Sequence, residues 1–279
     1  ASTTLANQAL VQRLWATAGG VLLLASALLL LLLRRVRQTG RLLASNQARL
    51  KVQSERDALT GASSRRHAQA VLAEAGAQGH LSGALLMVDL DHFKQINDRH
   101  GHAAGDEVLA TMAQRIMSAL RPQDLVARWG GEEFLVYAGD MGRDEADALA
   151  TRLLHAVSGQ PVELKTAGAQ ALRVTASIGH AVFPLAPHGL AVGVEQATNL
   201  VDMALYSAKG QGRHRAVGIV GCDASTAAAL RDVEADFEGA WQAGRLQLRT
   251  DLGPGPVLDH APAGAHWAPI EQNLSETHP

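Results

Sequence analysis

The pattern of apolar and polar positions divides the chain into distinct parts. Residues 14–33 form an apolar run without a charged side chain. Further along, short apolar runs typical of buried strands alternate with segments whose apolar residues recur at helical spacing. Residues 249–279 are rich in Pro, Gly and Ala. This pattern predicts an apolar helix, then an α/β domain, then an irregular tail.

One predicted strand ends in carboxylates. The apolar run 84–88 is typical of a strand buried on both faces, and Asp89 and Asp91 follow it. If the strand continues, these two side chains project to the same side. Apolar residues at helical spacing over 108–120 predict a helix after it. An Asp at the end of a buried run is costly without a partner, so it is a candidate metal ligand.

A second acidic segment lies in a predicted hairpin. The β-favouring runs 125–129 and 134–138 flank Gly130-Gly131-Glu132-Glu133. The glycine pair predicts a turn in φ > 0 conformations. Adjacent carboxylates repel unless a cation joins them, and a hard divalent cation bound through oxygen fits this need. A solvated acidic turn is the alternative.

These segments belong to an ordered set of motifs that resembles the GGDEF-domain diguanylate cyclases, in the GGEEF form of the signature. The resemblance covers roughly residues 57–219 and implies an α/β palm-like domain with a mainly antiparallel five-stranded sheet flanked by helices. The matching segments are 57–61, 65–66, 89–106, 130–134, 174–179, 202–209 and 212–213. Ala62, Ser63 and Ser64 depart from the family pattern, which usually has Leu and Asn before its Arg pair.

The resemblance implies that two GTP molecules condense into cyclic di-GMP and release two pyrophosphates. It implies two Mg²⁺ or Mn²⁺ ions in each half-site, held by Asp89, the Leu90 carbonyl, Glu132 and Glu133. Either glutamate would take the proton of the attacking 3′-hydroxyl, and the sequence leaves this choice open. Two metals can stabilise both the attacking and the leaving oxygen.

The triphosphate would lie against Lys94, Lys209 and Arg213, because phosphoryl transfer depends on charge neutralisation. Lys94 is also a candidate catalytic residue. Lys209 and Arg213 lie four residues apart and share a helical face if the helix persists there. Ordinary surface cations are the alternative.

The resemblance implies that Asn97 and Asp106 recognise guanine and that Phe93 and His102 are further substrate-binding residues. An Asp carboxylate can accept hydrogen bonds from guanine N1–H and its exocyclic amine, whereas adenine offers no matching donors. A site built for these bonds discriminates strongly against the wrong base. The alternative for Asp106 is an acidic residue in the first turn of a helix.

Arg121 and Asp124 form an R-x-x-D segment five residues before Gly130. In the family this spacing marks an inhibitory site for the cyclic product, and an Arg fork recognises phosphate well. Arg152 is a candidate second arm from a neighbouring chain. A helix C-terminal cation and a turn residue are the alternatives for Arg121 and Asp124.

The twenty residues 14–33 are long enough to span a bilayer as a helix. The arginines after this span are Arg34, Arg35, Arg37 and Arg41, whereas Arg13 stands alone before it. This asymmetry predicts a single-pass protein of the inner (cytoplasmic) membrane, with residues 1–13 outside and the catalytic domain in the cytoplasm. A signal peptide would have a shorter apolar region that ends in small residues. We expect a sensory portion upstream of Ala1.

Residues 34–56 are predicted to form a helical, coiled-coil-like linker. Val36, Leu43 and Leu50 recur every seven residues, but the companion positions Thr39, Asn46 and Gln53 are polar. Such a seam favours a weak, adjustable homodimer, and a single solvated helix is the alternative. Dimerisation matters because one domain binds one GTP, so two domains must face each other.

Composition excludes some functions. The 279 residues carry a formal net charge of −2, which gives no indication of nucleic-acid binding. The single cysteine, Cys222, permits no internal disulfide.

The tail, residues 220–279, is predicted to be helical over 224–244 and largely disordered from 249. Residues 231–248 loosely resemble the start of a cyclic di-GMP phosphodiesterase domain, and what remains is too short for a hydrolase.

Two other functions stay open. One is a catalytically silent GGDEF domain that acts as a receptor for GTP or cyclic di-GMP. The other is a membrane protein that only makes protein contacts. The full set of carboxylates and cations favours the cyclase.

Overall fold

The computed structural model describes residues 55–77, 79–165 and 170–254, together with Trp15, Leu30, Arg34 and Arg35. The chain divides into two units, residues 1–53 and 54–279, and the four described residues of the first are helical. Among the residues described, no helix is both long and apolar enough to cross a bilayer. Most of the predicted span and most of the predicted linker lie outside the described residues.

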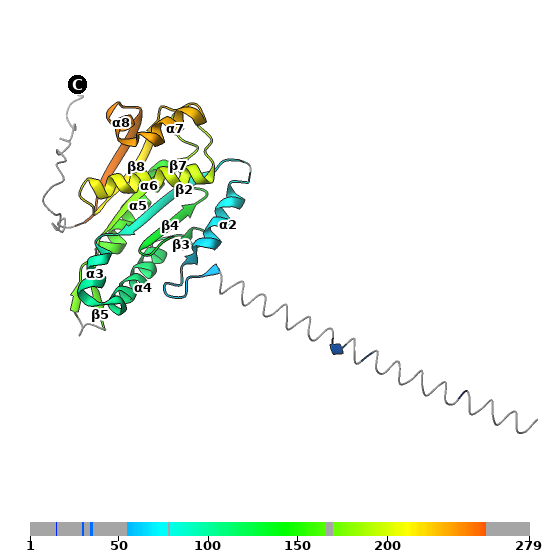
Figure 1. Cartoon of the computed structure of the whole chain (residues 1–279), viewed down its shortest axis with the longest axis vertical. Coiled ribbons are helices and arrows are strands. Elements are labelled where there is room, and N and C mark those ends of the chain that lie inside the picture. The colour runs from blue at the N-terminus through cyan, green and yellow to red at the C-terminus, as the bar shows by residue number, and fades with distance from the viewer. Residues whose placement is uncertain are drawn as a thin grey trace, which may run out of the picture. The chain divides into compact units, whose positions relative to one another are not determined.

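The second unit is built on one large sheet, shown in Figure 1. Its seven strands lie in the order β1 (Ser63–Ser64), β3 (Leu125–Arg128), β4 (Glu133–Ala138), β2 (Gly83–Leu90), β7 (Ala176–Phe183), β8 (Arg215–Cys222) and β9 (Leu246–Leu252). Neighbours are antiparallel except for the pairs β1–β3 and β7–β8. A separate hairpin joins β5 (Val162–Leu164) and β6 (Gln170–Leu172).

Helices cover both faces of this sheet. One face packs against α2 (Arg65–Ala75), α6 (Val194–Gly210), α7 (Ala227–Ala235) and α8 (Phe237–Gln242), and α6 crosses the front of the sheet in Figure 1. The other face packs against α3 (Phe93–His100), α4 (His102–Ser118) and α5 (Arg143–Ser158). All eight residues of β2 are therefore buried, as its unbroken apolar run predicted.

Alternation along β2 decides which side of the sheet each side chain faces. Leu86 and Val88 belong to the apolar core beneath α3, α4 and α5, whereas Leu85 and Met87 belong to the core beneath α2 and α6. Asp89, one step beyond Val88, therefore faces the α6 side at the end of the strand. This placement brings the carboxylate toward the cations of α6.

The predicted mainly antiparallel α/β sheet is confirmed, but its predicted five strands are wrong. Two of the seven are edge strands: β1 contains only two residues, and β9 comes from the tail. The residues that depart from the family pattern have local roles, since Ser63 pairs with Ala127 in β1. The Ser64 hydroxyl caps α2 by accepting a hydrogen bond from the His67 amide.

The tail is more ordered than its composition predicted. The two helices α7 and α8 lie within the predicted helical segment 224–244. Residues 249–252, predicted to be disordered, instead continue β9, because Leu246 is buried and the segment pairs along β8. Residues 255–279 lie outside the described part of the chain.

An ion pair holds β9 against α5. Arg249 Nη1 lies 3.1 Å from Asp147 Oδ2, and Asp147 is buried. Next to this pair, burial and the Arg249 charge lower the pKa of His180 to about 4. His180 is therefore neutral at physiological pH, and Arg249 supplies the positive charge that the buried Asp147 carboxylate requires.

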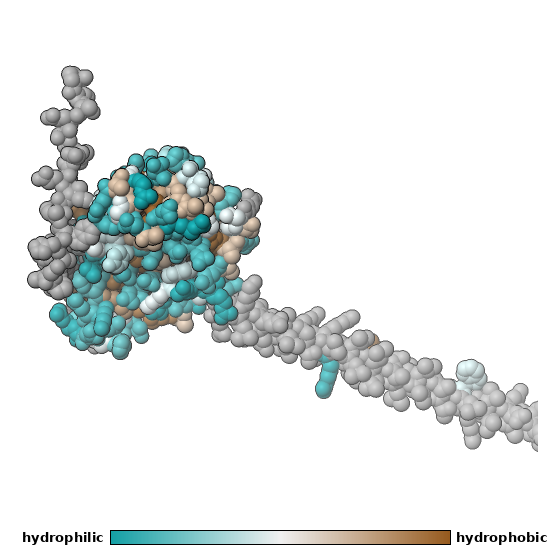
Figure 2. Space-filling view, turned by 45° about the horizontal axis from the view of Figure 1, so that its top comes forward, coloured by the Kyte–Doolittle hydropathy of each residue, from teal (hydrophilic) through white to brown (hydrophobic). Residues whose placement is uncertain are grey.

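The surface in Figure 2 is mostly hydrophilic, with small scattered apolar areas. Within the described part of residues 54–279, the large exposed hydrophobic side chains are Tyr206 and Leu252. The face in view therefore offers no broad apolar patch of the kind that permanent dimers bury.

Direct packing of α6 on β7 gives a test of the fold. A Cβ atom at Gly179 would collide with the Val201 carbonyl oxygen and the Leu205 amide of α6. We expect Gly179→Ala to lower the free energy of unfolding by about 1–3 kcal/mol, the usual cost of overpacking. Gly193→Ala is the matched control, because a Cβ there meets no atom within 4 Å. Equal urea midpoints for the two variants would contradict this packing.

Candidate active site

The two predicted acidic segments meet where β2 ends beside the β3–β4 hairpin. Asp89 lies opposite Glu133 in the register of β2 and β4. The Leu90 amide donates to the Glu132 carbonyl oxygen at 3.3 Å. Strand pairing therefore brings Asp89, Leu90, Glu132 and Glu133 to one end of the central strands.

Asp89 is the most strongly perturbed carboxylate of this group. Burial raises its pKa to about 6, and the charges of Glu132 and Asp91 add to the rise. The Lys209 ammonium opposes this effect from 2.8 Å away. A carboxylate that is buried yet still within reach of cations is a common feature of functional sites.

Asp89 lines a cavity of about 280 Å³, here named the Asp89 pocket. Its lining residues are Asp89, Leu90, His92, Phe93, Lys94, Gln95, Glu132, Lys209 and Arg213. Lys209 and Arg213 do not share a helical face, because the helix does not persist to Arg213: α6 ends at Gly210 and Arg213 has a φ of 61°. The turn after the helix nevertheless brings Arg213 to the same pocket.

A second cavity, of about 530 Å³, lies beside the first and is named the Asn97 pocket. Its lining residues are Phe93, Lys94, Asn97, Asp98, His102, Asp106, Leu109, Arg128, Gly131 and Glu132. The two cavities share Phe93, Lys94 and Glu132 and are therefore contiguous. All the predicted base-binding residues line this pocket.

Helix geometry accounts for that grouping. Phe93 and Asn97 are one turn apart on α3, and His102 and Asp106 are one turn apart on α4. Because α4 begins at His102, Asp106 lies beyond its first turn, and the first turn holds no acidic residue. The dipole-based alternative for Asp106 is therefore weakened.

Glu133 lines a different cavity, a groove between α2 and α6. The groove residues include Arg65, Trp129, Glu133, Asn199 and Asp202. Within it, the Arg65 guanidinium lies 4.7 Å from the centre of the Trp129 ring. Glu132 and Glu133, adjacent in sequence, thus line different cavities.

The two signature glycines do not have the predicted backbone conformation. The φ > 0 turn is wrong, since neither Gly130 nor Gly131 has a positive φ. A Cβ atom at Gly130 would instead collide with the Glu133 carboxylate. Gly130 therefore leaves room for this carboxylate beside the hairpin backbone, and a larger residue there would displace the flexible Glu133 side chain.

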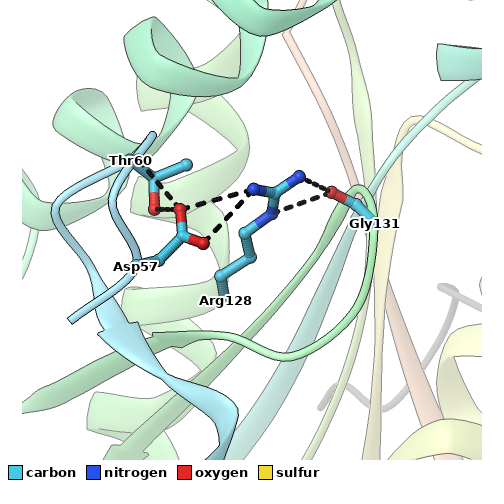
Figure 3. A network of polar contacts seen from close by, with 4 residues as sticks. All are labelled: Asp57, Thr60, Arg128 and Gly131. Carbon is cyan, nitrogen blue, oxygen red and sulfur yellow. Dashed lines mark hydrogen bonds and ion pairs between the residues drawn. The ribbon is translucent and has the colours of Figure 1, made fainter. Parts of the chain in front are cut away.

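Arg128, which the sequence interpretation missed, holds the hairpin tip in place (Figure 3). Its guanidinium donates to the Gly131 carbonyl oxygen at 2.8 and 3.1 Å. The same group lies 3.3 Å from both carboxylate oxygens of Asp57, and Asp57 Oδ1 also accepts from the backbone amide and the hydroxyl of Thr60. The position of this Arg directly before Trp-Gly-Gly was the sequence feature that could have indicated its role in the hairpin.

The Asp57 carboxylate is charged in this network. Burial acts to raise its pKa, but the hydrogen bonds from Thr60 and the nearby Arg128 outweigh burial and lower it. The network therefore ties the N-terminal motif of the domain to the acidic loop.

Asp91 does not share the surroundings of Asp89. Its carboxylate is buried and accepts from the hydroxyls of Thr175 and Ser177. The prediction that both Asp side chains project to one side assumed a continuing strand, whereas β2 ends at Leu90.

The R-x-x-D segment forms a turn after α4. Asp124 accepts from the Arg121 amide at 2.9 Å, while the Arg121 guanidinium contacts Glu145 of α5 at 2.9 Å. Glu145, and not Asp124, therefore holds the Arg121 guanidinium. Nearby, Arg152 Nε donates to the Ala119 carbonyl oxygen at 2.8 Å. The Arg121–Glu145 pair is about half exposed, so a phosphate can replace the carboxylate at low cost.

The donor chemistry of the site fits a divalent cation that takes some of its ligands from a bound phosphate group. In the described part of the chain, no three His, Cys, Asp or Glu side chains form a ready metal cluster. Mg²⁺ in phosphate-transfer sites is commonly held by one or two carboxylates together with substrate phosphates. Asp89 and Glu132 provide such carboxylates in one pocket, and the Lys209 ammonium on Asp89 shows the need for positive charge there.

The fold and these pockets define an α/β domain with an acidic, cation-lined site at the ends of its central strands. The profile of the family described as "Diguanylate cyclase, GGDEF domain" matches residues 54–215. The chain belongs to this family.

Several curated proteins are similar to it. Diguanylate cyclase DgcM of Escherichia coli (strain K12) is 38% identical over 179 residues, which are 61% of this chain and 41% of DgcM. Response regulator PleD of Caulobacter vibrioides is 38% identical over 165 residues, or 58% of this chain and 35% of PleD. The chain thus spans less than half the length of these relatives.

Solved structures show the same fold. The coiled coil and GGDEF domain of DgcB from Caulobacter crescentus, in complex with c-di-GMP, matches with a TM-score of 0.59 and 25% identity. The match covers 66% of this chain and 97% of that one.

The raised pKa of Asp89 gives a stability prediction. The pKa of Asp89 is about 6 in the folded protein and 3.8 in the unfolded chain. The cost of its charge therefore grows as the pH rises from about 3.8 to 6, is complete above pH 6, and is relieved by acidification back through this range. We expect Asp89→Asn to stabilise the metal-free protein by roughly 1–3 kcal/mol at pH 7.5. Thermal melts at pH 7.5 and 4 should show the gain at the higher pH alone.

Proposed function

We propose that this protein is a diguanylate cyclase that condenses two GTP molecules into cyclic di-GMP and two pyrophosphates. The main observation behind the proposal is that two contiguous pockets lie beside the end of β2 and the start of β4. One pocket combines carboxylates with three cations, and the other combines an amide and a carboxylate with apolar walls. The family membership and the DgcB complex with c-di-GMP support the same reaction.

The Asn97 pocket binds guanine in this proposal. Phe93 and Leu109 provide apolar contact for the purine, while Asp106 accepts from N1–H and the exocyclic amine and Asn97 bonds the same edge. His102 completes the wall. Adenine would leave the Asp106 carboxylate unpaired, and this is the physical basis of selectivity for GTP.

The Asp89 pocket binds the triphosphate. Lys94, Lys209 and Arg213 neutralise its charge and orient the α-phosphate for in-line attack. Two Mg²⁺ or Mn²⁺ ions, held by Asp89, the Leu90 carbonyl, Glu132 and Glu133, supply charge stabilisation of the attacking and leaving oxygens when bound. Glu132 or Glu133 accepts the proton of the attacking 3′-hydroxyl.

One domain provides one GTP site, so the reaction requires a homodimer in which two such sites face each other. The coiled-coil-like linker at 34–56 provides a weak and adjustable means of pairing. We further propose that residues 14–33 anchor the protein in the inner membrane with the catalytic domain in the cytoplasm. The arginines that follow this run support that orientation.

Purified protein incubated with GTP and Mg²⁺ tests the proposal, with cyclic di-GMP measured by chromatography. We expect product from the unmodified chain and a loss of about 10²–10⁴-fold in Glu133→Ala, the scale of general acid–base catalysis. Glu163→Ala is the matched control, because Glu163 is an exposed glutamate of β5. GTP binding without product in the unmodified chain would instead identify a silent receptor.

We also propose that cyclic di-GMP inhibits the enzyme at Arg121, with Asp124 shaping the turn and Arg152 as a second arm. Arg121→Ala should raise the inhibition constant for cyclic di-GMP at least about tenfold, because it removes charge-assisted bonds to phosphate. Its initial rate without product should not change.

Glu145→Gln is the matched opposite variant for this site. It frees the Arg121 guanidinium from its ion pair, so the inhibition constant should stay the same or fall. Equal inhibition of Arg121→Ala and the unmodified enzyme would place the product site elsewhere.

A further inference from the structure

The turn after α6 contains two adjacent residues in the left-handed region, Arg213 with a φ of 61° and His214 with a φ of 50°. Neither is glycine, and such conformations persist only where surrounding contacts fix them, often at functional sites. This turn places Arg213 in the Asp89 pocket. The contacts that fix the turn therefore bear on the function of that arginine.

Every backbone polar group of these two residues has a partner. The Arg213 amide donates to the Ala208 carbonyl oxygen at 3.0 Å, and the Arg213 carbonyl accepts from Arg215 Nε at 2.9 Å. The His214 carbonyl accepts from the Gly253 amide at 2.8 Å. The His214 amide donates to Asp91 Oδ2 at 3.1 Å.

Among these four hydrogen bonds, the one from the His214 amide to Asp91 has a carboxylate as its acceptor. Asp91 is only 4% exposed, and both of its oxygens are occupied. Oδ1 accepts from the Ser177 hydroxyl at 2.7 Å, and Oδ2 accepts from the Thr175 hydroxyl at 2.8 Å as well as from His214. Asp91 thus joins the end of β2, the start of β7 and the turn after α6.

We propose that Asp91 is a positioning residue for the triphosphate. By holding the His214 amide, it fixes the left-handed turn and thereby directs the Arg213 guanidinium toward the phosphates. The inference rests on the proposed function, since it takes GTP as the ligand of the Asp89 pocket. It also gives the two Asp residues of the segment different roles, because Asp89 faces the ligand and Asp91 acts through Arg213.

Asp91→Asn tests this role, since it keeps the shape of the side chain and removes its charge. Calorimetry in Mg²⁺ would compare guanosine with a GTP analogue that carries a methylene between its α- and β-phosphorus atoms. We expect the affinity for the analogue to fall about three- to tenfold, because the Asn oxygen still accepts from the His214 amide but the hydrogen bond is no longer charge-assisted. Affinity for guanosine should stay the same, because Asp91 does not line the Asn97 pocket. In turnover, KM for GTP should rise more than kcat falls.

A double-mutant cycle identifies the route of the effect. In an Arg213→Ala background, Asp91→Asn should cause no further loss of analogue affinity. Leu153→Ala, a buried core change on α5, controls for stability and should lower the melting temperature without changing the ratio of the two affinities. Should Asp91→Asn fail to fold, Ser177→Ala removes a single donor to Asp91 and is expected to lower analogue affinity by about two- to threefold.

Three results would overturn the inference: equal losses for guanosine and the analogue, no loss for either, or full additivity with Arg213→Ala. If the unmodified chain binds no analogue, the result would contradict both the proposed function and this inference. Binding without cyclic product would contradict the cyclase alone, and the affinities would still decide the role of Asp91.

Discussion

The burial of a carboxylate at the end of the central strand is the constraint on which the rest of this site depends. Asp89 continues an apolar strand that helices cover on both faces, so its charge is poorly solvated and its pKa rises to about 6. The fold compensates with Lys209 from α6, which offsets only part of this cost. A site of this kind gains from additional positive charge, such as that of a bound divalent cation.

Around this carboxylate, the sheet assembles the site from segments far apart in sequence. Pairing of β2 with β4 brings the Glu132–Glu133 pair beside Asp89, and α3 and α4 form the neighbouring pocket. The hairpin does not rely on glycine turn geometry for its shape. Instead, Arg128 holds the loop carbonyl on one side and Asp57 on the other.

The C-terminal segment contributes to the same site from the opposite edge of the sheet. The family profile ends at residue 215, yet β9 extends the sheet beyond β8 and the Gly253 amide contacts His214. The turn that carries Arg213 thus has support from within the family domain and from the segment after it. Its two left-handed residues are stable because each backbone group has a partner.

Local patterns in the sequence determined the central strand, the hairpin strands and the helix predicted over 108–120, which the structure ends at Ser118. The ordered motifs identified residues that the structure brings to the two pockets. These predictions succeeded because they depend on periodicity and on ordered motifs, which neighbouring residues define. Tertiary structure alone decided the orientation of Asp91, the grip of Arg128 on the acidic loop and the partner of Arg121. Only the tertiary structure added β9 to the sheet, since an edge strand with weak alternation gains its order from pairing with β8. Such contacts join residues distant in the chain, and no local pattern specifies them.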